Sequence, residues 1–153
     1  MKYQYLKELE DIAANATIER DPMIEAITEL AERGARVTAE AVPFWTSAST
    51  ERVIPALDAV ASELEKRGWK CLVEKEKPYL GEFHAALKTT HPKSIVVQVR
   101  GHSEEKNGKV VHTFSFGAFG GYFEDYLDLP GDMEVEDIER NVLAVLGSAA
   151  KRA

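Results

Sequence analysis

The chain of 153 residues contains a single cysteine, Cys71, and no apolar run of the length that a transmembrane helix needs. One cysteine excludes an internal disulfide and a metal site built from several thiolates. Because Cys71 lies in an apolar stretch, we expect a buried and inert thiol. The first residues, Met-Lys-Tyr-Gln-Tyr, lead straight into charged helical sequence without the apolar centre of a signal peptide, so a cytoplasmic location is expected.

Catalytic, metal-binding and nucleotide-binding motifs are also missing from the sequence. The four histidines show neither the spacing of a helical His-x-x-x-His pair nor a nearby pair of cysteines, so no metal is expected. The glycine-rich segment 117–121 lacks the Gly-Lys-Ser/Thr ending of a phosphate-binding loop. We therefore expect no cofactor, and the balance leans against an enzyme.

The composition is that of an ordinary globular protein, with 44% hydrophobic and 29% charged residues. A chain of this length buries a core without disulfides or metals, so residues 1–153 are expected to form a single domain. The net charge of −7 argues against direct binding to nucleic acid or to an anionic membrane. Its distribution is uneven, because residues 69–116 carry eight basic against five acidic residues, whereas residues 117–153 carry three against eight.

Helical periodicity dominates the first part of the chain. Apolar residues three and four apart predict a helix over about 2–15 and a second over about 22–33, which begins at Asp21-Pro22 and ends at Arg33-Gly34. Residues 35–48 suit either a helical continuation or a short strand, and Pro43 is expected to end either one. A third helix over about 50–67 is predicted to begin with Ser49 or Thr50 as its cap and to end at Gly68.

From Trp69 the apolar period changes to two, which predicts strands over about 69–75, 82–89, 94–102 and 109–116. The Asn107-Gly108 pair between the last two strands is typical of a tight hairpin. Short connections favour an antiparallel arrangement. A last helix is predicted over about 135–147. The predicted fold is therefore α+β, a four-stranded antiparallel β-meander covered on one face by the N-terminal helices and the C-terminal helix.

The same alternation predicts which side chains face the helices: Ile95, Val97, Val99, His112, Phe114 and Phe116. His112 on that face should need a hydrogen-bond partner or a neutral ring. The opposite face carries the polar residues Glu82, His84, Lys88, Gln98, Arg100, Thr113 and Ser115. Such a face is often only solvated, but it offers an alternative function as a small enzyme or anion-binding protein, with His84 as acid or base and Lys88 and Arg100 as stabilising charges.

Residues 124–139 contain eight acids and neither Lys nor Arg, the strongest local bias in the sequence. A loop followed by an acidic first helical turn explains this bias without any function. A functional interpretation is an acidic surface that binds a basic protein partner, and in one version of it the partner is a protein that itself binds nucleic acid. The residues expected to contact that partner are Glu124, Asp125, Tyr126, Asp128, Leu129 and Asp132.

The leading hypothesis from the sequence is therefore a non-enzymatic protein-binding or regulatory module, of an inhibitor or immunity type, that uses this acidic surface. A third interpretation is a subunit of an assembly, which includes a homo-oligomer held together through the N-terminal helices.

Overall fold

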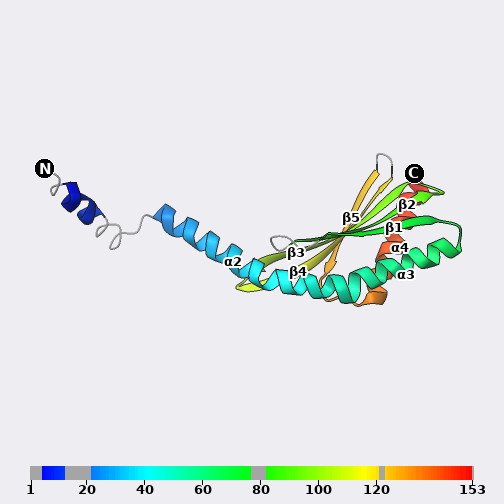
Figure 1. Ribbon diagram of the computed structural model, residues 1–153, viewed down its shortest axis with the longest axis horizontal. Helices are drawn as coiled ribbons and strands as arrows, with labels where there is room; N and C mark the ends of the chain where they lie inside the picture. The colour runs from blue at the N-terminus through cyan, green and yellow to red at the C-terminus, as the bar shows by residue number, and fades with distance from the viewer. Residues whose placement is uncertain (1–4, 13–21, 77–81, 121–122, 153) are drawn as a thin grey trace. The chain divides into compact units, whose positions relative to one another are not determined.

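The computed structural model describes residues 5–12, 22–76, 82–120 and 123–152, and the side chains of residues 120–126 lie outside that description. Residues 5–12 are helical. The other elements are α2 (Pro22–Ala48), the π-helix η1 (Ser49–Val53), α3 (Ile54–Lys66), β1 (Lys70–Lys75), β2 (Phe83–His91), β3 (Ile95–Lys106), β4 (Lys109–Gly120), β5 (Phe123–Pro130) and α4 (Val135–Arg152) (Figure 1). The predicted α+β class is confirmed.

The chain divides into two compact units, Met1–Arg36 and Val37–Ala153. The first unit contains helical residues 5–12 and the first part of α2. The second contains the rest of α2, all five strands, α3 and α4. That the whole chain forms one domain stays a prediction.

Helix α2 continues through Gly34 and Pro43, the two residues that the sequence predicted would end it. Both predictions are wrong, and residues 35–48 are helical. A glycine inside a helix costs only about 1 kcal/mol and a proline about 3 kcal/mol. The second part of α2 offsets these costs by burying Trp45 and Ala48, which are 0% and 1% exposed.

The predicted start of the third helix is also wrong, because η1 joins α2 to α3 without a break and no side chain caps the first turn of α3. Its predicted end is confirmed. Gly68 has a φ of 89°, and its N–H donates to the carbonyl of Glu65. The N–H of Trp69 donates to the carbonyl of Leu64, which completes a glycine-based helix stop.

The sheet is an antiparallel meander in the order β1-β2-β3-β4-β5. The Asn107-Gly108 hairpin is confirmed, since these two residues have φ values of 52° and 76° and Lys106 pairs with Lys109. The sheet has one strand more than predicted. Residues 123–130, expected as a loop, pair with β4 as the edge strand β5.

One face of the sheet forms the core with the helices. Ile95, Val97, Val99, Phe114 and Phe116 are each 0% exposed, as predicted. They pack with buried apolar residues of α3 and α4, which lie alongside the sheet (Figure 1). We call the other face, which carries His84, Gln98, Arg100, Ser115 and Asp128, the open face.

Trp45 joins α2 to this core. Its indole nitrogen Nε1 donates a 2.8 Å hydrogen bond to Ser103 Oγ on β3. The ring lies directly over Gly101, where an added Cβ would come within 2.5 Å of the indole. The sheet therefore needs glycine at position 101 so that the indole can approach its backbone.

Candidate functional site

A row of four polar side chains crosses the open face from β2 to β5. The register places His84 opposite Arg100, Arg100 opposite Ser115, and Ser115 opposite Asp128. Neighbouring strands lie about 4.8 Å apart, so consecutive members of the row are neighbours in space. Asp128 thus brings the acidic segment, predicted as a separate surface, into the polar face of the sheet.

These four side chains line a hollow of about 300 Å³ together with Glu82, Gly101 and His102. Glu82 Oε2 lies 3.5 Å from His84 Nε2. Arg100 Nε donates a 3.0 Å hydrogen bond to Gln98 Oε1. The hollow therefore contains a guanidinium group, two imidazoles, a hydroxyl and two carboxylates.

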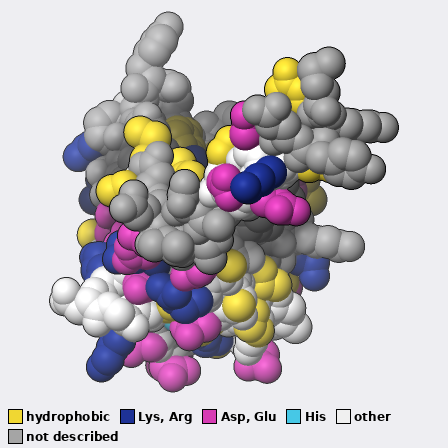
Figure 2. Space-filling view, turned by 90° about the vertical axis from the view of Figure 1, so that its left-hand side faces the viewer, with side chains coloured by type: hydrophobic (Ala, Val, Ile, Leu, Met, Phe, Trp, Pro, Cys, Tyr) yellow, Lys and Arg dark blue, Asp and Glu magenta, His cyan; other side chains and the backbone are white. Residues whose placement is uncertain are grey.

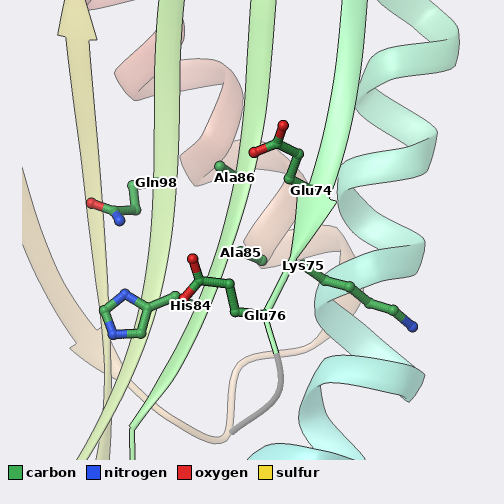
Figure 3. A pocket seen from close by; sticks show the side chains of 7 residues that line it. All are labelled: Glu74, Lys75, Glu76, His84, Ala85, Ala86 and Gln98. Carbon is green, nitrogen blue, oxygen red and sulfur yellow. The ribbon is translucent and has the colours of Figure 1, made fainter. Parts of the chain in front are cut away.

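A second hollow of about 280 Å³ adjoins the first, because His84 lines both. Figure 3 shows the side chains of Glu74, Glu76, His84 and Gln98 around it, with Lys75 pointing away from them. Ala86 contributes only a methyl group to its lining, which leaves room above the sheet. The Glu76 N–H donates to the carbonyl of His84, so β-type pairing continues past the end of β1 and holds Glu76 at this site.

Carboxylates outnumber permanent cations in the lining of the two hollows. The carboxylates are Glu74, Glu76, Glu82 and Asp128, and the cations are Lys75 and Arg100. Glu74 Oε2 also forms an ion pair with Lys88 Nζ, which lies 2.8 Å away, and both side chains are almost half exposed. Such exposed pairs exchange readily with water and contribute about 0 to 1 kcal/mol each. The described part of the two hollows favours a cationic ligand group over an anionic one.

The trio proposed for catalysis or anion binding is only partly brought together. His84 and Arg100 are opposite one another and line the same hollow. Lys88 lies on the same strand as His84 but pairs with Glu74 and lines neither hollow. The use of these residues as a catalytic site stays a prediction.

The six residues predicted to bind a partner are spread over β5 and the turn that follows it. Glu124, Asp125 and Tyr126 pair through their backbones with Phe119, Ala118 and Gly117, and their side chains lie outside the described part. Asp128 and Asp132 are exposed, whereas Leu129 packs against the hydrophobic core. Among the described members, Asp128 is the one that lines a hollow of the open face.

A constellation that the sequence did not predict surrounds His112. Its ring stacks on Phe44 with centroids 3.8 Å apart, and its Nδ1 lies 2.6 Å from Ser103 Oγ. Burial lowers the pKa of His112, and the charge of Glu40 opposes this shift. His112 therefore has the hydrogen-bond partner that its position on the covered face required, and that prediction is confirmed. A hollow of about 280 Å³ lies beside it, lined by Phe44, His112, Pro130, Gly131 and Asp132.

In the part of the chain that the structure describes, no group of three His, Cys, Asp or Glu residues is placed to hold a metal ion. None of the described helices is both long and apolar enough to cross a membrane. Cys71 is partly buried, and its burial, with the charge of Glu65, raises the pKa of the thiol.

Comparison with protein-family models, with curated proteins and with solved structures finds no match to this chain.

Proposed function

We propose that this chain is a protein-binding module that engages a basic partner through the acidic hollows of its open face. One observation supports this proposal most directly. Asp128, from the acidic segment, and Glu82 line the same hollow, and the adjoining hollow is lined by Glu74 and Glu76. Arginine or lysine side chains of a partner fit such hollows, because each would gain carboxylate acceptors.

Exposed carboxylates contribute little to folding but accelerate and orient association with a positively charged partner. Asp128 and Glu76 are both exposed, and Glu82 has 58% of its side chain accessible. An arginine of the partner would also be able to stack on the imidazole of His84, which lies between the two hollows. Binding through these groups should weaken as salt rises, because exposed charges are screened over roughly 8 Å at physiological ionic strength.

The alternative of an anion-binding or catalytic face has less support. Lys88, one of its two stabilising charges, is paired with Glu74 and lies outside both hollows. Glu82 and Asp128 flank the remaining pair, His84 and Arg100, and would repel a phosphate or carboxylate ligand.

The experiment is a binding titration of the full chain with fluorescein-labelled octa-arginine, followed by fluorescence anisotropy. The double variant Glu82→Lys/Asp128→Lys should bind roughly tenfold more weakly, which corresponds to about 1.4 kcal/mol. The matched control is Asp58→Lys/Glu65→Lys, which makes the same change in net charge at two exposed positions of α3. Equal losses in the two double variants would show that only net charge matters, and the proposal would fail.

A further inference from the structure

An apolar row crosses the open face beside the two acidic hollows. The register places Leu72 opposite Lys88, Lys88 opposite Val96, and Val96 opposite Phe119. Leu72 is 57% exposed, and Val96 and Phe119 are half-buried. We call Leu72, Val96 and Phe119 the apolar row. Its side chains come from β1, β3 and β4, so the sheet brings the row together from three separate segments of the sequence.

The position of the apolar row, more than its exposure, suggests a role. Figure 2 shows one face of the molecule on which apolar side chains lie at the surface among acidic and basic ones, and single exposed apolar residues are common in proteins. The apolar row instead adjoins the first hollow. Glu74 and Ala86, which line that hollow, are two residues from Leu72 and Lys88 on the same strands.

Lys88 places a charge in the middle of the apolar row, but this charge is directed at the neighbouring row. Its Nζ lies 2.8 Å from Glu74 Oε2. The methylene groups of a lysine are apolar and cover hydrophobic surface while the ammonium group reaches a polar partner. Lys88 is therefore compatible with an apolar contact between Leu72 and Val96.

The apolar row and the hollows follow one another along the strands with the period of an extended chain. Residues two apart on a strand point to the same face and lie about 6.8 Å from each other. One such step on β2 leads from Lys88 to Ala86, and a second leads to His84. The hollows follow the same step, because Ala86 and His84 line the first, and His84 and Glu82 line the second.

We propose that the partner presents an extended segment in which one large apolar residue is two and four positions away from two arginine or lysine residues. Laid along β2, this segment would place its apolar side chain on the apolar row and its two basic side chains in the two hollows. Glu74 and Glu76 would receive the first basic group and Glu82 the second. Contacts with alternate side chains give specificity to the binding of extended peptides. The inference rests on the proposed function, since it specifies the partner of the same hollows.

The first test compares three end-blocked peptides of identical composition, with dissociation constants measured from the amide shifts of the ¹⁵N-labelled full chain. Two alternate, Leu-Ser-Arg-Ser-Arg and its reverse Arg-Ser-Arg-Ser-Leu, because the side chains of the open face do not fix the direction of a bound segment. The third, Ser-Leu-Arg-Arg-Ser, turns one of its three large side chains away from the sheet when it is extended. The tighter of the alternating peptides should bind roughly tenfold more tightly than the third.

The second test removes the apolar contact. Leu72→Ser should weaken binding of the tighter alternating peptide roughly fivefold, and it should leave unchanged the binding of the same peptide with glycine in place of leucine. Val111→Ser is the matched control and should change neither. Val111 is also an exposed apolar residue of the open face, but it pairs with Glu104 at the other end of β4. Near-ultraviolet circular dichroism of the buried Trp45 checks that each variant is folded.

Equal affinities for the alternating and non-alternating peptides, or an alternating peptide that binds Leu72→Ser as it binds the wild type, overturn the inference. The proposed function survives that result if Glu82→Lys/Asp128→Lys still weakens binding of every peptide. It fails together with the inference if this double variant binds the peptides as tightly as the wild type does.

Discussion

Trp45 and Ser103 are 58 residues apart in the chain and are joined by a buried 2.8 Å hydrogen bond from the indole N–H to the serine hydroxyl. An indole nitrogen can only donate, so Ser103 Oγ accepts this bond and its own hydrogen is left for another acceptor. Nδ1 of His112, 2.6 Å away, is that acceptor when the imidazole is neutral. Helix α2, strand β3 and strand β4 are thus connected through two successive hydrogen bonds that meet at Ser103.

The first prediction concerns pH. The pKa of His112 is lowered by burial in the folded protein, whereas in the unfolded chain it returns to its ordinary value of 6.5. Between the two values the unfolded state binds more protons, so the free energy of unfolding decreases as pH falls through this window, by at most about 1.4 kcal/mol per pH unit. Urea unfolding at pH 7.5 and pH 5.5 measures this effect. The free energy of unfolding should decrease more between these two pH values in the wild type than in His112→Gln.

The exposed His102 provides the control for this prediction. His102→Gln should keep the pH dependence of the wild type, because it leaves His112 and the contacts of His112 unchanged. If His112→Gln and His102→Gln lose the same stability between the two pH values as the wild type, His112 does not contribute through its protonation.

A second prediction compares two glycines. Gly101→Ala should destabilise the protein by about 1 to 3 kcal/mol, because its Cβ would overlap the buried ring of Trp45. Gly147→Ala, inside α4, should stabilise it by about 0.5 to 1 kcal/mol, because a Cβ there meets nothing within 4 Å and alanine favours the helix. Urea unfolding of both variants measures the two effects. Equal changes in stability would contradict the placement of Trp45 over Gly101.

A third prediction tests the path of α2 through Gly34. If the helix ended there in the left-handed conformation, alanine would be strained. Because α2 continues and a Cβ at Gly34 meets nothing within 4 Å, Gly34→Ala should favour the helix by about 1 kcal/mol. Circular dichroism at 222 nm should show increased helicity. A decrease would indicate that the helix ends at Gly34 as the local sequence predicted.

Local rules predicted the fold where they act within one element or one turn. The alternation in β3 and β4 identified the buried residues, and Asn107-Gly108 and Gly68 fixed a hairpin and a helix end. Long-range packing decided the cases where prediction was wrong. Burial of Trp45 keeps α2 helical past Gly34 and Pro43. Residues 123–130 contain three acidic residues, which are unfavourable in strands, but they form β5 because they pair with β4.

The candidate site depended on the register between strands, which a single sequence does not reveal. The alternation placed His84 and Arg100 on one face, but it could not show that they are opposite each other or that Asp128 continues their row. The hollow of Glu74 and Glu76 likewise arises from tertiary structure, since these two acids precede the β1–β2 connection and have no distinctive spacing.

The central claim is that a basic partner binds the acidic hollows of the open face. Nuclear magnetic resonance tests this claim, because it shows which residues a basic peptide contacts. A ¹⁵N-labelled chain titrated with octa-arginine should show its largest amide shifts at His84, Arg100, Ser115 and Asp128, and these should diminish at high salt. Shifts confined to α3 or to residues 5–12 and 22–36, or the absence of any shift at the open face, would contradict the account.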